Sequence, residues 1–501
     1  MNNLIQHNNI SNMPWQLLAY SLLGIIVGIL LVLVPLLQGI VFIAGIILLI
    51  AGVKRPEYVV LTIVILTSSI IFEAKLPLIP IGIGSLHIAD TLLLFLFGII
   101  GYRAICSNTT LSEISPINKL LWLFMGTVII SAVISVYTYG VDISFVFRRL
   151  REVSYYLLFY LITSLVTEKR QIQFLIRGLF CIAMVVAVTM LVQAVVGESI
   201  QLMPGRVEVA STFGEEFDAT RILPPGTTLV LVLLIMSICF VTFIKERSIL
   251  KSGQFYIFMV LGIGIVLTYT RSYWITVLLA ISLLLLIPSV KYKLRLLAML
   301  AIVAILATTL ITTFANFDKR FENTLFAVSA RVSSLFAGKD LTQSSSLESR
   351  QIENSYAIPL IERHPVLGIG LGNDYRPPIF GDNDTITYYI HNGYLWILTD
   401  MGILGLVSFM LFYGGFLIRA VRNWNNIGDI YLKTAIVSFV LSGIGILLMS
   451  LYVPLFMEWH SIVVIATIMG LSETIIRYNL KAAGSRTCQH KNNSERCLRR
   501  E

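Results

Sequence analysis

Long apolar runs recur along almost the whole chain, and they constrain the fold more than any other feature. Each is about 18–25 residues long, the length that an α-helix needs to cross the hydrocarbon core of a bilayer. The chain is 56% hydrophobic and 13% charged, whereas about 25% of the residues in a soluble domain are charged. A water-soluble core cannot absorb so many apolar segments. The sequence therefore predicts an all-α fold, a polytopic transmembrane helical bundle.

About fourteen runs qualify as helices, and we expect about 12–14 membrane spans. The predicted helices are 16–34, 38–53, 58–72, 91–105, 120–138, 152–167, 173–196, 223–244, 254–270, 272–289, 296–314, 393–417, 431–452 and 454–476. The N-terminus is polar and uncharged, and the apolar run after it is too long for a signal-peptide core, so no cleavable signal is expected.

The basic residues between these runs indicate the orientation. With the N-terminus in the cytoplasm, nearly every compact Lys/Arg cluster falls on the cytoplasmic side, as the positive-inside rule expects. These clusters are "VKRPEY", "TEKRQIQ", "KERSILKSG", "KYKLR", "RAVRNW" and the tail after Ile476. The formal charge of +9 is thus assigned to cytoplasmic loops, and no nucleic-acid partner is expected. One large extracytoplasmic loop, about 315–392, lies on the other side.

Neither a disulfide nor a metal site is predicted. The five cysteines fall in cytoplasmic segments or inside helices, where structural disulfides are not expected. The histidines that fall outside show no metal-ligand spacing; they are His87, His364, His391 and His460. No cofactor is predicted either.

Six arginines break the charge asymmetry, because they fall on or near the translocated side. They are Arg148, Arg149, Arg151, Arg221, Arg271 and Arg350. Arginine is costly near hydrocarbon on that side, so a compensating role is expected. The planar guanidinium group suits bidentate contact with phosphate or carboxylate. Several such groups on one face predict a site for an anion such as a diphosphate.

A structural role remains the alternative for most of these arginines. Glu152 lies at helical spacing from Arg148 and Arg149, so an ion pair is available, and Arg151 can extend its charged end to the interface. For Arg350, in a polar loop, a solvated charge is the default. Arg271 differs because it lies in a very short turn between two apolar helices with no acid nearby in the sequence.

The loop re-enters the membrane at "TYYIHNGYLWILTDMGILG", residues 387–405. His391 and Asn392 directly precede an apolar helix that starts near Gly393. An imidazole can accept a proton from a hydroxyl group, although a hydrogen-bonded anchor is the alternative role for His391. Asp400 is two and a half helical turns further on, about 13 Å away on the opposite face. We therefore expect it to be a buried, partnered carboxylate that does not orient His391.

Two further stretches of the loop have a structural interpretation. "SSLESRQIENSYAIPLIERHP", residues 345–365, has apolar residues at helical spacing and is predicted to be a helix that ends at His364-Pro365. "GIGLGNDYRPP", residues 368–378, is rich in glycine but lacks the Lys-Ser/Thr that completes a phosphate-binding loop. We expect it to be a tight structural turn.

Three of these stretches together resemble the O-antigen ligase and polymerase superfamily. They are "TRSYW" (270–274), "SRQIENSYAIPLIERHPVLGIGLGND" (349–374) and "HNGYLWILTDMGILGLVSF" (391–409). Their order, spacing and loop size fit the family across about residues 250–420. One departure is Asp400, where the family more often has glutamate.

The resemblance implies an integral membrane glycosyltransferase of surface polysaccharide biosynthesis. Such a protein moves a glycan from undecaprenyl diphosphate to an acceptor hydroxyl on the outer face of the bacterial inner membrane. The acceptor is lipid A core for a ligase and a growing polysaccharide for a polymerase, and no metal is required. Arg271 and Arg221 would hold the diphosphate, and His391 would contact the acceptor hydroxyl or the departing phosphate.

Two alternatives come from other classes: a flippase or transporter of lipid-linked glycans, and a non-catalytic polysaccharide-export protein. The predicted organisation is an N-terminal bundle (1–249), a ligase-like core (250–420), C-terminal helices (421–480) and a basic cytoplasmic tail (481–501).

Overall fold

The structure is a computed structural model that describes residues 36–68, 70–72, 76–106, 115–212, 215–244, 248–286, 289–314, 326–333, 345–378 and 386–498. The chain divides into two compact units, Met1–Val59 and Val60–Glu501. The helix predicted over 16–34 lies outside the described residues. The second unit contains all the residues of the site discussed below.

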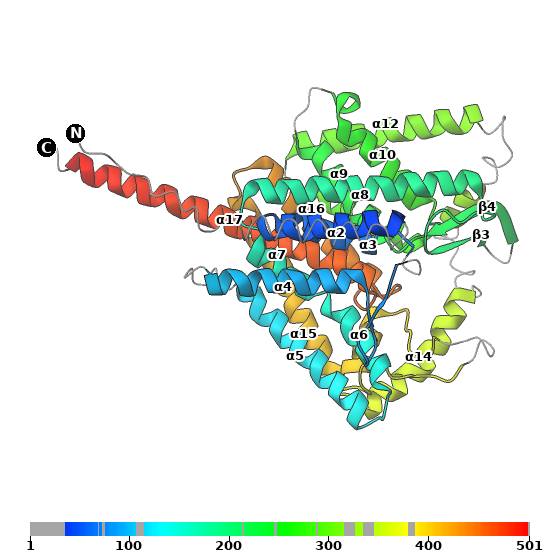
Figure 1. The fold of residues 1–501 in the computed structure, drawn as a ribbon. Coiled ribbons are helices and arrows are strands. Elements are labelled where there is room, and N and C mark those ends of the chain that lie inside the picture. Colours follow the sequence, from blue (N-terminus) through cyan, green and yellow to red (C-terminus); the bar gives the residue numbers. More distant parts are fainter. Residues whose placement is uncertain are drawn as a thin grey trace. The chain divides into compact units, whose positions relative to one another are not determined.

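The described part of the chain is almost entirely helical, which confirms the predicted fold class (Figure 1). The helices are α2 (Leu36–Lys54), α3 (Pro56–Thr67), α4 (Ile88–Cys106), α5 (Pro116–Tyr137), α6 (Ile143–Ser154), α7 (Leu157–Leu165), α8 (Lys169–Val196), α9 (Thr227–Phe243), α10 (Gly253–Val266), α11 (Arg271–Leu285), α12 (Val290–Phe314), α14 (Ser345–Arg363), α15 (Gly393–Asn423), α16 (Ile430–Met449) and α17 (Trp459–Leu498), with short 3₁₀ turns η3 (Ile249–Lys251) and η4 (Trp424–Asn426). A further helical segment covers residues 326–333.

Six of the described helices are long and apolar enough to cross a membrane: α4, α5, α8, α15, α16 and α17. Five further apolar stretches are shorter, among them α9, α10 and α11. The predicted span 152–167 is instead divided at Tyr155–Tyr156 between the amphipathic α6 and the nine-residue α7. A helix of nine residues is about 14 Å long, less than half of the hydrocarbon thickness, so α7 alone does not span.

The core lies around α9, which is buried on every side and packs against α8, α10 and α16. The apolar part of α17 is also buried almost throughout, and it packs against α7. Next to it, α5 packs along α15, and aromatic rings fill the space between these helices. The rings belong to Phe124, Tyr156, Phe159, Phe409, Phe412, Tyr413 and Phe456.

The outer helices expose apolar side chains rather than polar ones. Trp122 and Ile130 of α5, Val185 of α8 and Leu411 of α15 are about half exposed. A helix surface of this kind is stable against lipid and costly against water. The chain is therefore a multi-pass membrane protein.

At the start of several helices, a side chain near the first turn caps the free backbone N–H groups. Ser115 caps α5 through a hydrogen bond from the Ile117 N–H to its hydroxyl, and Pro116 follows at the first helical position. Asp429 caps α16 in the same way, accepting hydrogen bonds from Tyr431 and Leu432.

Helix α15 is interrupted at Gly402, where the backbone takes φ 61° and ψ −164°. The glycine-rich segment after α14 fills the interruption with backbone hydrogen bonds. Ile369 and Gly370 donate to the carbonyls of Thr399 and Asp400, and Ile403 donates to the carbonyl of Pro365. Gly368, Gly370 and Gly372 all have positive φ. The segment is thus a tight structural turn, as predicted.

We expect Gly370→Ala to destabilise the protein strongly. Gly370 has φ +95°, and a Cβ atom there would lie 2.6 Å from the Cα atom of Ser135, which is backbone and cannot move aside cheaply. The expected loss is at least about 2 kcal/mol, since a positive φ alone costs about 1–2 kcal/mol with a side chain. Thermal unfolding in detergent measures it. Gly414→Ala, with open space around its Cβ position, is the matched control. Equal unfolding temperatures for both variants would contradict the role of this turn.

Two small antiparallel hairpins interrupt the helical pattern. The first pairs β1 (Ile79–Pro80) with β2 (Ser85–Leu86), and the second pairs β3 (Arg206–Thr212) with β4 (Glu215–Leu223). The β3–β4 hairpin follows the end of α8 and lies on the same side of the view as α14 (Figure 1). In its register Glu208 lies opposite Arg221. The sequence predicted only an outer loop here, so the position of Arg221 on a strand is new.

Candidate functional site

His391 is held by a buried carboxylate on a different helix. The Nδ1 atom of His391 lies 2.6 Å from Oε1 of Glu353, and the backbone N–H of His391 donates to Oε2 at 2.9 Å. Glu353 comes from α14, and its side chain is 6% exposed, whereas that of His391 is 39% exposed. The carboxylate therefore fixes the imidazole from one side and leaves the ring accessible from the other.

Asn392 positions His391 by starting the next helix. Its side-chain oxygen accepts hydrogen bonds from the N–H groups of Tyr394 and Leu395, at 3.0 and 3.2 Å, so it is the N-cap of α15. His391 is consequently fixed to the first turn of a long apolar helix. The supporting role predicted for Asn392 is in this structure a capping role.

A second buried acid lies beside the histidine. The hydroxyl of Tyr389 donates to Oε1 of Glu458 at 3.0 Å, and the Tyr389 ring packs edge-on against the His391 ring at 5.0 Å. Burial raises the pKa of Glu458, although the Tyr389 hydrogen bond and the nearby His391 and Arg149 act in the opposite direction. Burial also raises the pKa of Tyr389. The histidine therefore lies against an aromatic wall backed by a carboxyl group.

Three arginines gather on the neighbouring part of the site: Arg221 from β4, Arg271 at the start of α11, and Arg331 from the segment 326–333. Burial, together with the positive charges of Arg221 and Arg271, lowers the pKa of Arg331 to about 10, although Glu208 acts in the opposite direction. Burial likewise lowers the pKa of Arg221. Like charges brought together in a partly buried place favour a bound anion.

Local geometry directs Arg271 into this cluster. Tyr269, two residues earlier, has φ 47°, a left-handed conformation that costs free energy for a bulky residue. Arg271 then opens α11, where the first N–H groups have no helical partner and favour negative charge. Its Nε atom is buried without a hydrogen-bond partner, and among the described residues it has no carboxylate partner. Such a donor is available to a ligand.

Arg221 has more partners among the described residues than Arg271 has. It makes an ion pair with Glu208 across the hairpin, at 2.9 Å, and its Nε atom donates to the carbonyl of Thr268 at 3.2 Å. The second contact connects the hairpin to the residues just before Arg271. Glu208 thus balances part of the positive charge and orders the cluster.

Tyr273 connects the arginine cluster to the histidine. It lies on the first turn of α11 and interacts electrostatically with both Arg221 and Glu458. Glu458 in turn is hydrogen-bonded to Tyr389, next to His391. The structure therefore brings Arg221, Arg271 and His391 into one site, although they lie far apart in the sequence.

Arg350 lies on the histidine side of this site. It is one turn before Glu353 on α14, and its Nη2 atom donates to the carbonyl of Tyr452 at 3.3 Å. Burial lowers its pKa, and the charge of Glu353 acts against that shift. Arg350 is thus placed beside the His391–Glu353 pair rather than in the arginine cluster.

The arginines of α6 separate into three environments. Arg149 is buried, makes an ion pair with Glu152, and stacks over the Trp396 ring at 4.4 Å. Arg151 makes an ion pair with buried Asp90 at 3.0 Å. Arg148 is exposed and lies over the Phe145 ring. Arg149 and Arg151 therefore have structural partners, which is the alternative role that the sequence left open for them. None of the three arginines joins the arginine cluster.

Asp400 is buried in α15, two residues before the break. Arg149, the Trp396 side chain and the N–H of Gly372 are the groups near its carboxylate. Its backbone carbonyl accepts hydrogen bonds from Ser131 at 2.7 Å and from Gly370 at 3.1 Å. These contacts place Asp400 at the junction of α5, α15 and the glycine-rich turn, and Glu353 is the residue that orients His391.

Reasoning from the sequence missed four residues of the site: Arg331, Glu353, Tyr389 and Glu458. Glu353 had a detectable signal, because it follows Arg350 by three residues in the same family-like stretch and shares its helical face. Arg331 had none, since the segment 326–333 carries no motif. Within the described residues, no group of three or more potential metal ligands is present.

The fold and site define a multi-pass helical membrane protein with an arginine cluster next to a carboxylate-held histidine. A family model described as O-antigen ligase matches residues 255–410, the range that contains Arg271, Arg331, Arg350, Glu353 and His391. This match confirms the resemblance to the O-antigen ligase family that the sequence predicted over this part of the chain, and together with the apolar helices it supports a membrane glycan-processing enzyme.

Other comparisons add little. No curated protein matches this chain. A solved structure described as "Structural coordination of polymerization and crosslinking by a peptidoglycan synthase complex" is similar at 14% identity, covering 72% of this chain and 96% of that chain, with a TM-score of 0.37.

Proposed function

We propose that the protein is a glycosyltransferase that moves a glycan from undecaprenyl diphosphate to an acceptor hydroxyl in surface polysaccharide biosynthesis. The main observation in support of this proposal is the His391–Glu353 pair beside the cluster of Arg221, Arg271 and Arg331. A base next to an anion site is what transfer from a diphosphate requires. The acceptor is lipid A core if the protein is a ligase and a carrier-linked polysaccharide if it is a polymerase.

In this proposal His391 is the general base. Because Nδ1 faces the Glu353 carboxylate, it carries the proton and donates it, and the lone pair of Nε2 is left for the acceptor. Nε2 takes the proton of the acceptor hydroxyl while its oxygen forms a bond to the anomeric carbon. The bond between that carbon and the phosphate oxygen breaks, and the electron pair leaves with the diphosphate.

The arginines stabilise the charge that develops on the leaving diphosphate. Arg271 offers, at a helix N-terminus, a buried Nε atom that has no hydrogen-bond partner among the described residues, and Arg221 and Arg331 add positive charge beside it. Preorganised donors of this kind act on the leaving group without a metal ion. We therefore propose metal-independent catalysis.

The experiment that tests this function is turnover by purified protein with a lipid-linked donor, in the presence of EDTA. Transfer to lipid A core identifies a ligase, and growth of a carrier-linked polymer identifies a polymerase. Movement of the donor across a vesicle membrane without new glycosidic bonds would instead identify a flippase. No turnover with any acceptor would support a non-catalytic export protein, and turnover lost in EDTA but restored by one divalent ion would refute metal independence.

Glu353→Gln should lower kcat about 10–100-fold, the usual contribution of a group that orients a functional histidine. An amide can turn its NH₂ group toward Nδ1 and then favour the wrong tautomer. KM for the donor should change little, because the arginines bind the donor. Glu362→Gln, an exposed glutamate on the same helix, is the matched control. Unchanged kcat in Glu353→Gln would show that the carboxylate is not needed to orient the imidazole.

We further propose that the site faces the outside of the bacterial inner membrane, which follows from the positive-inside orientation. In a variant lacking the five native cysteines, Ser355→Cys on α14 should react with an impermeant thiol reagent in intact cells. Asn425→Cys, exposed in η4, should react only after lysis. Equal labelling of both in intact cells would overturn the orientation.

A further inference from the structure

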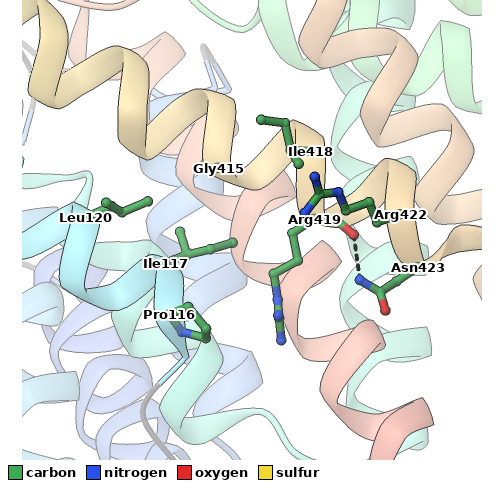
Figure 2. A pocket seen from close by; sticks show the side chains of 8 residues that line it. All are labelled: Pro116, Ile117, Leu120, Gly415, Ile418, Arg419, Arg422 and Asn423. Atoms are coloured by element: carbon green, nitrogen blue, oxygen red, sulfur yellow. Dashed lines mark hydrogen bonds between the residues drawn. The ribbon is translucent and has the colours of Figure 1, made fainter.

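A pocket lies between α5 and α15, at the opposite end of α15 from His391. Its volume is about 240 Å³, and the first two turns of α5 and the last turns of α15 form its walls. Figure 2 shows the side chains that line it: Pro116, Ile117, Leu120, Gly415, Ile418, Arg419, Arg422 and Asn423. His391 lies just before the Asn392 cap of α15, whereas Arg419 and Arg422 lie in the last two turns of this helix, so the two sites are at opposite ends of a helix long and apolar enough to cross a membrane.

The lining has two chemically different parts. Pro116, Ile117, Leu120 and Ile418 supply an apolar wall, and Arg419, Arg422 and Asn423 supply a polar end (Figure 2). Beyond the apolar wall, the next turn of α5 exposes Trp122 and Leu123 toward the outside of the bundle. The pocket thus combines a cationic end with an apolar path along the surface of the helices.

The charges at the polar end are unbalanced. Nε of Arg419 donates to Oε2 of Glu473 at 2.6 Å, and Glu473 is buried, so this carboxylate is already used. Arg422 is exposed in the last turn of α15, and among the residues that the structure describes it has no ion-pair partner. Two guanidinium groups thus share one described carboxylate, which leaves one positive charge at the pocket.

We propose that this pocket binds the phosphate headgroup of an anionic phospholipid from the cytoplasmic leaflet. Guanidinium groups bind phosphate oxygens in bidentate fashion, and basic pockets between membrane helices on this side favour anionic headgroups. The cavity is too small for a whole lipid, so it takes the phosphate and the adjoining glycerol. The acyl chains then lie along the exposed apolar side chains of α5 and α15.

This lipid bridges the two helices that hold each other in place. Because α5 and α15 pack along one another, a ligand that contacts both helices at this end stabilises their packing. The site involves neither His391 nor the arginine cluster, so it does not depend on the proposed transfer reaction.

The test is lipid-dependent thermal stability of the purified protein. Phosphatidylglycerol added to the protein in detergent should raise the unfolding temperature in a saturable way, and phosphatidylcholine should not. Arg422→Gln should weaken the apparent affinity for phosphatidylglycerol about fivefold, since one basic residue contributes on the order of 1 kcal/mol to binding an anionic lipid surface. Arg422→Lys should lose less. Lys481→Gln, which removes an exposed charge near the end of the membrane part of α17, should bind as the wild type does.

Three outcomes would overturn the proposal. The first is an equal response of the wild type to both lipids. The second is an Arg422→Gln variant that responds to phosphatidylglycerol as the wild type does, or no more weakly than Lys481→Gln. The third is full stabilisation by inorganic phosphate alone, which would identify a site for a free anion. Native mass spectrometry of the same variants counts the retained lipid and is unaffected by loss of transfer activity.

Discussion

His391→Ala should slow glycan transfer by about 10²–10⁴-fold, the contribution of a positioned general base. The imidazole is held by Glu353 at 2.6 Å and is accessible on its other side, so its removal takes away the group that accepts the hydroxyl proton. Donor affinity should change much less than turnover, because the arginines hold the diphosphate. Single-turnover transfer and donor binding, each per mole of folded protein, separate the two effects.

His364→Ala is the matched control for His391→Ala. His364 also lies in the predicted outer loop, and its Nδ1 atom is 3.2 Å from the Tyr139 hydroxyl, but it is remote from the arginine cluster in all of its described contacts. Near-normal turnover by folded His391→Ala protein would mean that the histidine only anchors the start of α15. A loss of similar size in His364→Ala would mean that the effect reports loop stability.

Arg271→Ala should reduce transfer by about 10²–10³-fold, since removing one preorganised donor to a developing anion has an effect of this order. Arg271→Lys retains the charge but loses the planar fork, so it should recover only part of the activity. In contrast to His391→Ala, these variants should also bind the donor more weakly. Arg148→Ala, an exposed arginine outside the cluster, should transfer normally. Full activity in Arg271→Ala at normal protein level would remove Arg271 from the site.

The sequence predicted the helical membrane fold because each span is long, apolar and locally encoded. It also predicted that Arg271 and His391 are functional, since Arg271 lies unpaired between two apolar helices and His391 begins the most family-like stretch. The placement of both residues in one site agrees with that expectation, and their roles remain predictions. For Arg149 the sequence offered the local partner Glu152, which the structure shows, whereas its stacking on the Trp396 ring and the ion pair of Arg151 with Asp90 involve distant parts of the chain and could not be predicted.

The contacts that sequence reasoning missed are those between distant segments. Glu353 and His391 are 38 residues apart, and nothing local to either residue indicates the other. The proximity of Arg331 to Arg221 and Arg271 depends likewise on tertiary folding. Asp400 was expected to be a buried carboxylate that does not orient His391, and its contacts lie with α5 and the glycine-rich turn.

The break in α15 has a consequence for how this loop can vary in length. Glu353 lies on α14, and the turn that follows α14 is joined to α15 by backbone hydrogen bonds at residues 365–370. His391 is attached to the start of that same α15 through the Asn392 cap. The distance between the Glu353 carboxylate and the His391 imidazole is thus determined by two backbone attachments to α15, one through the turn after α14 and one through the Asn392 cap. An insertion or deletion of one residue between Glu353 and Arg363, the end of α14, would rotate Glu353 by about 100° around the helix axis relative to the turn, so this stretch is intolerant of length change even where its side chains are replaceable.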